Sequence, residues 1–284
     1  MKIRAPAKIN LGLRVVGRRA DGYHLLDTIM LPVSLYDEII IQKGKKSSLK
    51  GRLTVTCDDP LVPPGKKNLA YKAASLLLNK KDINESLHIH IHKRIPVGAG
   101  LGGGSTDAAA TLVTLNRLFR LGYKRKGLEN IASTIGADVP FFVKGVPARA
   151  RGIGERLTPL RKVPRLWLII LYPKFPVSTA WVYRNLHPKL TKAIVNTSIN
   201  FSLGSPANLR KLLVNDLETV TMGRYPRIGL LKEELARQGA IGTLMSGSGS
   251  SVFGVFRSKR SAERAFRRLL KKREVQAFLV RVVS

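Results

Sequence analysis

The chain has 284 residues, of which 44% are hydrophobic, and this predicts one large domain or two modest ones with a buried core. A single cysteine, Cys57, excludes an intrachain disulfide and favours a reducing, cytoplasmic setting, and we find neither an apolar run of about 18 residues nor a secretory leader. The formal net charge of +32 suggests nucleic acid as a partner, but lysine and arginine are spread along the whole chain, which favours a generally basic surface.

Apolar runs in the first third of the chain predict strands joined by turns. We expect strands over residues 3–16, 28–36, 38–43 and 52–57, a turn over 17–22 and a helix over 68–79. Lys8 lies inside the first of these strands, in a largely apolar segment. A lysine there either neutralises a phosphate, or lowers the pKa of a nearby carboxyl, or faces solvent, and these interpretations stay open.

The turn after the first strand presents an aromatic ring and an imidazole together. Tyr23 and His24 follow Asp21 and Gly22 directly. Such a pair is suited to stack on a nucleobase and to hydrogen-bond to its edge. Ordinary packing beside a turn is the alternative.

A strand with strict alternation is expected over residues 87–95, which begin Leu-His-Ile-His-Ile-His. His88, His90 and His92 share one face of this strand, an arrangement that also occurs in metal sites. Because no Cys, Asp or Glu accompanies them at ligand spacing, a half-exposed strand is the favoured interpretation.

Five glycines within seven positions, Gly98 to Gly104, precede a helix predicted to run to about Phe119. Glycine allows positive φ and lets the backbone come close to a ligand. We expect the helix to begin at Ser105 or Thr106, where its first N–H groups have no partner within the helix and its dipole attracts anions. The segment therefore predicts a site for nucleotide phosphate.

Two common phosphate-binding patterns do not fit this segment. A Walker A loop requires a lysine before its Ser or Thr, but Ser105 follows the last glycine directly. The dinucleotide pattern G-x-G-x-x-G is present at Gly98, Gly100 and Gly103. That pattern also requires an acid about 20 residues further on, at the end of a strand, and residues 118–128 contain neither.

A carboxylate in an apolar segment follows the helix predicted over residues 126–135. Asp138 stands in Gly-Ala-Asp-Val-Pro-Phe-Phe, and an acid among apolar neighbours is either paired or functional. From the residues alone, a helix-terminal role and a role as general base stay equally open. Short strands are expected over residues 141–145 and 148–152.

Recurring prolines near residues 157–164 predict a boundary between two domains, residues 1–160 and 161–284. Beyond it we expect strands over 166–172, 242–245, 252–256 and 275–283, and helices over 178–185, 206–213, 227–238 and 261–272. Mixed helices and antiparallel strands predict an α+β fold rather than a doubly wound sheet. The last helix carries its lysines and arginines on one face, which is typical of a solvated amphipathic helix.

A second glycine run, over residues 245–251, lies between two of these strands. Free N–H groups and hydroxyls in such a run are suited to hold a phosphate, and a flexible turn is the alternative. The residues that would do so are Ser246, Gly247, Ser248 and Gly249.

The segment Pro96 to Ala109 matches the pattern Pro-x-Gly-x-Gly-Leu-Gly-(Gly/Ser)-Gly-Ser-(Ser/Thr)-(Asp/Asn)-Ala-Ala at every position. It resembles the phosphate loop of the GHMP kinases, which include galactokinase, homoserine kinase and mevalonate kinase. Gly17-Arg-Arg-Ala-Asp-Gly-Tyr-His24 resembles the members of this family that act on a cytidine diphosphate-linked methylerythritol. The resemblance runs nearly from end to end of the chain.

This resemblance implies ATP-dependent phosphorylation of the 2-hydroxyl of the methylerythritol unit, in the non-mevalonate route to isoprenoid precursors. It implies Asp138 as the general base and Lys8 as its electrostatic partner. The implied substrate-binding residues are Asn10, Tyr23, His24, Thr179 and Tyr183. The aromatic rings among them would hold the cytosine.

The resemblance also implies ATP and Mg²⁺ as cofactors, with Ser105 as a candidate magnesium ligand. The implied ATP-binding residues are Asn68, Lys93, Pro96, Val97, Gly98, Ala99, Gly100, Leu101, Gly102, Gly103, Gly104, Ser105 and Thr106. The implied fold is α+β and two-lobed, with an N-lobe like the second domain of ribosomal protein S5 and a ferredoxin-like C-lobe. The implied partner is the small-molecule substrate, with no specific nucleic acid, no membrane, and a monomeric or homodimeric state.

Three alternative functions remain. One is another small-molecule kinase of the same family. A second is a nucleic-acid-binding protein, whose binding would depend strongly on salt and would not require Asp138. The third is a sensor that binds nucleotide without turnover.

Overall fold

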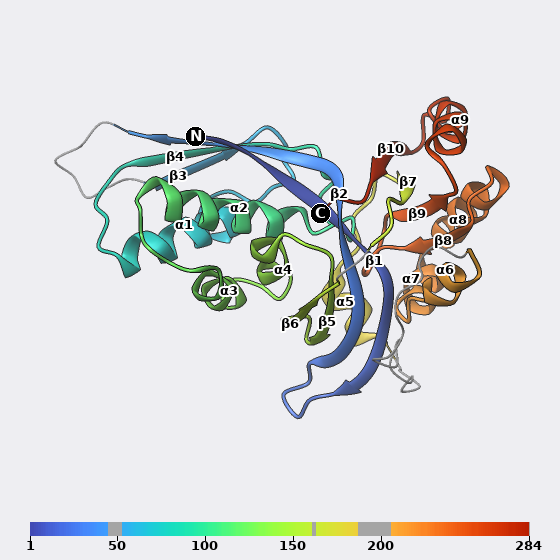
Figure 1. The fold of residues 1–284 in the computed structure, drawn as a ribbon, viewed down its shortest axis with the longest axis horizontal. Helices are drawn as coiled ribbons and strands as arrows, with labels where there is room; N and C mark the ends of the chain where they lie inside the picture. The colour runs from blue at the N-terminus through green and yellow to red at the C-terminus, as the bar shows by residue number, and fades with distance from the viewer. Residues whose placement is uncertain (45–52, 161–162, 187–205, 284) are drawn as a thin grey trace. The chain divides into compact units, whose positions relative to one another are not determined.

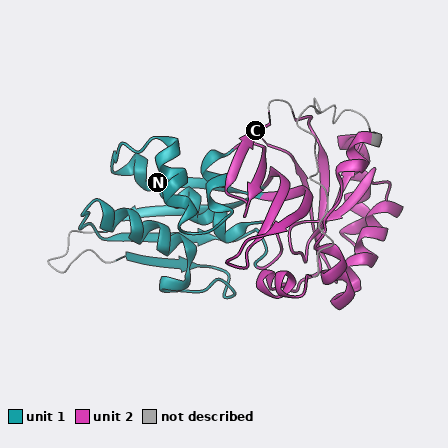
Figure 2. Cartoon of the chain, turned by 90° about the horizontal axis from the view of Figure 1, so that it is seen from below, with its two compact units in different colours: residues 1–7, 35–97, 102–145 teal, residues 8–34, 98–101, 146–284 magenta. Residues whose placement is uncertain are grey.

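The computed structural model describes residues 1–44, 53–160, 163–186 and 206–283 of the chain. It contains two compact units whose segments alternate along the sequence (Figure 2). Unit 1 comprises Met1–Ala7, Leu35–Val97 and Gly102–Gly145, and unit 2 comprises Lys8–Ser34, Gly98–Leu101 and Val146–Ser284. Two long strands and the glycine loop pass from one unit to the other. The division into two lobes, residues 1–160 and 161–284, stays a prediction.

Those two strands are β1 (Lys2–Arg18) and β2 (His24–Lys43), which pair with each other (Figure 1). The sequence predicts β2 as two separate strands, but the structure contains one continuous strand of 20 residues. The strand is buried from Leu26 to Val33. It continues through Tyr36 and Asp37 into the segment that pairs with β4.

The sheet of unit 1 adds β3 (Leu53–Cys57) and β4 (Leu87–His92) to β2. β4 runs antiparallel to β2, with Glu38 opposite His92, and parallel to β3, with Leu53 opposite Leu87. The leucine and isoleucines of β4 are buried and its histidines are not, as the alternation predicts. The histidines hydrogen-bond to neighbouring threonines: Thr54 lies 2.9 Å from His88 and Thr56 lies 2.8 Å from His90.

The described residues of unit 1 also contain four α-helices and a 3₁₀ turn. They are η1 (Gly65–Lys67), α1 (Leu69–Lys80), α2 (Gly103–Leu118), α3 (Arg125–Ser133) and α4 (Val139–Lys144). α1 and α2 are rich in alanine and leucine, which favour helix. α2 begins at Gly103, two residues before the expected start, because Gly102 adopts a left-handed conformation and takes the N-cap position.

The prediction of a strand over residues 141–145 is wrong, because these residues belong to α4. A short apolar run does not distinguish a buried strand from a buried helix. Pro140, in the first turn of α4, is compatible with the start of a helix, and Gly145 ends it in the left-handed conformation.

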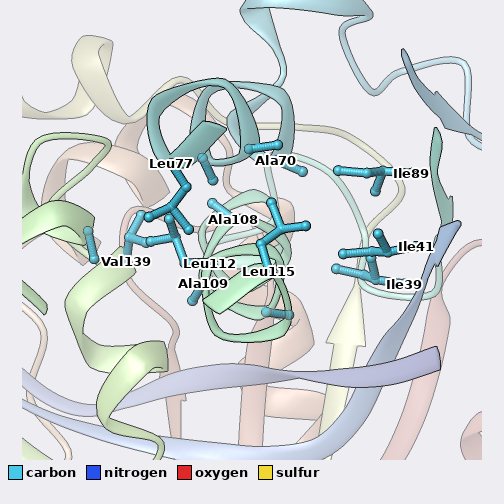
Figure 3. Close-up of a cluster of buried hydrophobic side chains, with 14 of the residues drawn as sticks. Ile39, Ile41, Ala70, Leu77, Ile89, Ala108, Ala109, Leu112, Leu115 and Val139 are labelled. Atoms are coloured by element: carbon cyan, nitrogen blue, oxygen red, sulfur yellow. The ribbon is translucent and has the colours of Figure 1, made fainter. Parts of the chain in front are cut away.

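Small and aliphatic side chains form the core of unit 1 (Figure 3). Figure 3 shows Leu77 of α1 and Leu112 and Leu115 of α2 gathered with Ile39, Ile41 and Ile89 of the strands. Alanines on the facing sides of α1 and α2, such as Ala70 and Ala108, let the two helices approach closely. Burial of each such leucine contributes about 1.5–3 kcal/mol to stability.

Unit 2 contains two groups of paired strands. β5 (Ala148–Gly152) pairs antiparallel with the first part of β2, and β6 (Arg156–Pro159) pairs with β5. The second group is an antiparallel sheet of β7 (Trp167–Tyr172), β8 (Gly242–Met245), β9 (Val252–Phe256) and β10 (Gln276–Arg281). Its order, β10-β7-β9-β8, is that of a ferredoxin-like sheet, as expected.

Two helices, α8 (Arg227–Arg237) and α9 (Lys259–Leu269), pack on this sheet. The described residues of unit 2 also contain α5 (Thr179–Arg184), α6 (Pro206–Leu212) and α7 (Glu218–Arg224). α9 begins two residues earlier than predicted because Ser258 and Ser261 form a capping box. Ala262, Ala265 and Leu269 are its buried face, and its basic side chains are exposed.

The described elements together are α+β, as predicted. Within the part of the chain that the structure describes, no helix combines the length and the apolar character needed to cross a bilayer.

Candidate functional site

The predicted site residues are divided between the two units. Unit 1 contains Asn68, Lys93, Pro96, Val97, Gly102, Gly103, Gly104, Ser105, Thr106 and Asp138. Unit 2 contains Lys8, Asn10, Tyr23, His24, Gly98, Ala99, Gly100, Leu101, Thr179, Tyr183, Ser246, Gly247, Ser248 and Gly249. We describe the two sets in turn.

In unit 1, the start of α2 is built to bind an anion. Gly102 has φ 74° at the N-cap position and supplies no side chain to cap the helix. The first turn closes with a hydrogen bond from the Thr106 N–H to the Gly102 carbonyl, 2.9 Å long. The N–H groups of the three preceding residues point along the helix axis, where the dipole also favours negative charge. Phosphate is the anion that such helix starts commonly bind.

The hydroxyl of Ser105 lies in this same first turn of α2. Mg²⁺ is usually held by one or two protein oxygens together with phosphate oxygens. The Ser105 hydroxyl, beside a helix start suited to phosphate, is compatible with this type of coordination. Among the described residues, no group of three or more His, Cys, Asp and Glu is arranged to hold a metal by itself. The predicted role of Ser105 as a magnesium ligand stays a prediction.

Two other predicted ATP-binding residues of unit 1 have side chains engaged within the protein. Asn68 is the N-cap of α1, and its Oδ1 accepts a 2.8 Å hydrogen bond from the Ala70 N–H. The Lys93 side chain is 3% exposed, and its ammonium forms ion pairs with Asp37 and Asp107. Lys93 therefore supports the loop from inside the unit, and a contact of its side chain with nucleotide stays a prediction.

Asp138 precedes α4 at the N-cap position, but its carboxylate makes no capping hydrogen bond to that helix. It is partly exposed, between the buried segments that contain Ile131 and Val139. The sequence leaves a helix-terminal role and a catalytic role open. Capping of α4 by the side chain therefore does not explain why an aspartate stands at position 138. The catalytic role of Asp138 stays a prediction.

In unit 2, the rest of the glycine loop packs against the second glycine run. Gly100 has φ 75°, and a Cβ there would overlap the carbonyl oxygen of Ser246. The Ser246 hydroxyl donates to the Gly100 carbonyl at 2.9 Å, and the Ser251 N–H donates to the Ala99 carbonyl at 3.1 Å. Only a residue without a side chain allows this approach of two backbones.

Lys8 lies beside these two glycine runs. Its N–H donates to the Leu101 carbonyl at 2.9 Å, and its ammonium donates to Asn10 Oδ1 at 2.6 Å. Asn10 Nδ2 in turn donates to the Thr28 hydroxyl at 2.8 Å. A Cβ on Gly247 would lie 3.4 Å from both the Lys8 ammonium and Asn10 Oδ1, so the second glycine run passes directly over this pair.

These contacts bear on two predicted residues. Lys8 is 5% exposed, so it does not face solvent. Asn10 is buried and uses both ends of its amide inside unit 2, where it orients the Lys8 ammonium. Direct contact of Asn10 with substrate stays a prediction.

The second glycine run is buried and well anchored, unlike a flexible surface turn. Asn215 Nδ2 donates to the carbonyls of Met245 and Gly247 at 2.9 and 2.8 Å. The hydroxyls of Thr179 and Ser248 are 2.8 Å apart, which ties α5 to the run. Predicted residues from three distant parts of the sequence therefore meet within unit 2.

The predicted base-binding rings also meet in unit 2. The His24 and Tyr183 rings are stacked, with centroids 5.3 Å apart and planes 28° apart. Tyr23, the residue before His24, is 60% exposed, which is unusual for a large aromatic side chain. Because the stacked rings leave no room for a base between them, a base must stack on an outer face or separate them.

Burial, together with the positive charge of Arg18, lowers the pKa of His24 from its ordinary value. The imidazole is therefore neutral at pH 7, with one donor and one acceptor nitrogen. That pair of groups matches the edge of cytosine, which carries both an amino donor and acceptor atoms.

Sequence reasoning assigns no role to Asp37, Asp107 or Thr28, although the structure places each of them against a predicted residue. Asp37 is followed by Glu38 and Asp107 is preceded by Thr106, so neither stands alone among apolar residues as Asp138 does. Their common partner, Lys93, lies 56 and 14 residues away along the chain.

Comparisons with known proteins identify the family of the chain. Residues 68–146 match the family described as GHMP kinases N terminal domain, and residues 190–275 match GHMP kinases C terminal. A protein of Citrifermentans bemidjiense named 4-diphosphocytidyl-2-C-methyl-D-erythritol kinase is 47% identical over 283 residues, which cover 100% of this chain and 99% of that protein.

Solved structures show the same fold. The crystal structure of a 4-(cytidine 5'-diphospho)-2C-methyl-D-erythritol kinase superposes with a TM-score of 0.80 at 36% identity, covering 100% of both chains. Homoserine kinase from Cytophaga hutchinsonii superposes with a TM-score of 0.74 at 21% identity, covering 100% of this chain and 94% of that one. The predicted resemblance and the predicted α+β fold are confirmed.

Proposed function

Because the chain belongs to the GHMP kinase family, we propose that it transfers the γ-phosphoryl group of ATP to the 2-hydroxyl of 4-diphosphocytidyl-2-C-methyl-D-erythritol. The observation that carries the chemistry is the meeting of Lys8 with both glycine runs in unit 2. The full-length similarity to proteins named for this substrate supports the choice of acceptor.

The glycine loop and the start of α2 bind the phosphates of ATP. Phosphoryl transfer requires charge neutralisation and in-line placement more than covalent help from the protein. Backbone N–H groups supply fixed donors that need no rearrangement when charge develops. Mg²⁺, bound to the phosphates and to Ser105, would neutralise part of their charge.

Asp138 and Lys8 act on the acceptor. The oxygen of the 2-hydroxyl attacks the γ-phosphorus, the bond from that phosphorus to the β–γ bridging oxygen breaks, and ADP leaves. Asp138 accepts the hydroxyl proton. The Lys8 ammonium, oriented by Asn10, stabilises the negative charge of the carboxylate and of the transferring group.

Tyr23, His24 and Tyr183 recognise the cytosine. Neutral His24 hydrogen-bonds to the base edge, and the two tyrosine rings provide stacking surfaces. Thr179, which is hydrogen-bonded to Ser248, links this pocket to the second glycine run. We place the enzyme in the non-mevalonate route to isoprenoid precursors and in the cytoplasm, with a small molecule as its partner.

A substrate panel tests the function. ADP release by the purified chain is measured with MgATP and 4-diphosphocytidyl-2-C-methyl-D-erythritol, homoserine, galactose or mevalonate. Turnover with the cytidyl substrate alone is expected. Turnover only with another alcohol would contradict recognition of cytosine but would still support phosphoryl transfer. Binding of ATP without any turnover would favour a nucleotide sensor.

Asp138→Asn tests the base in the same assay. We expect turnover to fall by at least about a hundredfold while ATP binding persists, because only proton transfer is lost. Asp82→Asn is the matched control, since Asp82 is exposed in the same unit. Near-normal turnover of the Asp138 variant removes this residue from the mechanism.

Tyr23→Ala and His24→Ala test the base pocket. Each is expected to raise the KM for the cytidyl substrate more than the KM for ATP, because the rings contact only the base. Equal effects on the two KM values would contradict base recognition by this pair.

A further inference from the structure

A buried cluster of three ionisable side chains lies inside unit 1 and has no part in the chemistry proposed above. The Lys93 ammonium forms an ion pair with Asp37 Oδ2 and lies 3.2 Å from Asp107 Oδ2. All three side chains are at most 3% exposed. Burial of charges is costly even when they are paired, so this cluster is weak evidence for a purely stabilising role.

The cluster ties together the two ends of the glycine loop. Asp37 Oδ1 accepts hydrogen bonds from the N–H groups of Arg94 and Ile95, 2.6 and 2.8 Å long, which fixes the chain just before the loop. Asp107 belongs to α2, just after the loop. The Lys93 ammonium joins both carboxylates, and so a single cation connects the segment entering the loop with the helix leaving it.

The ammonium also touches the first residue of α2. A Cβ on Gly103 would lie 2.7 Å from Lys93 Nζ and 3.2 Å from Ile95 Cγ2. Gly103 is therefore required by the lysine beneath it. A positive charge at this point adds to the positive end of the helix dipole and favours an anion at the helix start.

Asp107 completes the cluster. Its Oδ1 is buried, and among the described residues no donor reaches that oxygen. Burial raises the pKa of Asp107 to about 8, against the opposing effect of Lys93 and with a further contribution from the Asp37 charge.

We propose that Lys93 is a positioning residue of the phosphate loop: clamped by Asp37 and Asp107, it holds both ends of the glycine loop and places positive charge under the first turn of α2. This inference rests on the proposed function, because it assumes that the loop binds the phosphates of ATP. It assigns to Lys93 an action through the backbone of the loop, without contact of its side chain with the nucleotide.

Nucleotide affinity of the full chain, measured by titration calorimetry without the alcohol substrate, tests the proposal. Lys93→Met is expected to weaken binding of both MgATP and MgADP by at least about tenfold. Lys72→Met is the matched control, since Lys72 is exposed on α1. A folded Lys93→Met variant with MgATP affinity within about twofold of the wild type overturns the proposal.

A kinetic readout separates positioning from a general structural defect. Lys93→Met is expected to raise the KM for ATP and to leave the KM for the alcohol unchanged, because the cluster supports only the phosphate loop. Asp37→Asn is expected to act like Lys93→Met, since it removes the charge that holds the lysine and the loop entrance. Equal increases of both KM values count against the proposal.

Asp37→Asn provides a test that requires no lysine variant. A folded Asp37→Asn variant with wild-type MgATP affinity overturns the proposal even where Lys93→Met does not fold.

The outcomes also distinguish this inference from the proposed function. A wild type that binds MgATP but phosphorylates no alcohol overturns the function alone, because the affinity measurements stand without it. A wild type that does not bind MgATP overturns both.

Discussion

Two buried lysines, one in each unit, differ in the partners described above. Lys8 of unit 2 donates to the neutral amide oxygen of Asn10 at 2.6 Å, and this bond orients the ammonium. Lys93 of unit 1 lies against the carboxyl groups of Asp37 and Asp107. Position in an apolar segment is therefore a poor guide to a lysine's role, and the chemistry of its partners is a better one.

The largest expected effect concerns the stability of unit 1. Lys93→Met leaves Asp37 and Asp107 buried without their cation, and removal of one partner of a buried ion pair costs about 3–5 kcal/mol of unfolding free energy. Urea unfolding measures this loss. Adding Asp37→Asn and Asp107→Asn to the lysine variant is expected to restore part of the lost unfolding free energy. If nothing is restored, the unpaired charges are not the cause of the loss.

Lys8→Met is expected to act on turnover instead of stability. Removing a preorganised electrostatic group typically lowers kcat by about 10²–10³-fold. The thermal midpoint and the affinity for MgATP are expected to change little, because the charge acts on the transferring group. Steady-state kinetics and a melting curve check this, and a large loss of stability with normal kcat would reverse the comparison between the two lysines.

Asn10→Asp replaces the neutral amide that holds Lys8 by a carboxylate. A carboxylate at this position would offset the ammonium charge, and we expect kcat to fall by about tenfold while the protein stays folded. Asn10→Gln, which keeps a neutral amide, is the control. Unchanged activity of the aspartate variant would show that the charge of Lys8 is not what the reaction uses.

The smallest expected effect is on the pH dependence of the free energy of unfolding. Asp107 keeps a proton in the folded chain up to about pH 8, whereas in the unfolded chain it loses the proton near its ordinary pKa of about 4. Because the folded state binds more protons between these values, Asp107 makes the free energy of unfolding fall as pH rises from about 4 to about 8. Asp107→Asn is expected to flatten that fall, as measured by unfolding curves at several pH values. Equal slopes in both proteins would mean that Asp107 is ionised when folded.

Local patterns predicted most elements and the character of the loop. Alternation in Leu87–His92 predicted a half-buried strand, and the glycine spacing at Gly98–Gly104 predicted a helix start suited to phosphate. The same patterns misassigned α4, since a short apolar run fits a strand and a helix equally well. The start of α2 was misplaced because the sequence does not reveal that Gly102 takes the N-cap position.

The sequence by itself determined the family, the fold class and the residue types that could carry phosphoryl transfer, because periodicity, glycine spacing and motif order are local properties of the chain. Only the tertiary structure decided which groups are partners. Lys93 and Asp37 are 56 residues apart, and Asn215 and Gly247 are 32 residues apart. Burial and charge balance arise from such distant contacts, and these decide whether a lysine is suited to support a loop or to act on a reacting group.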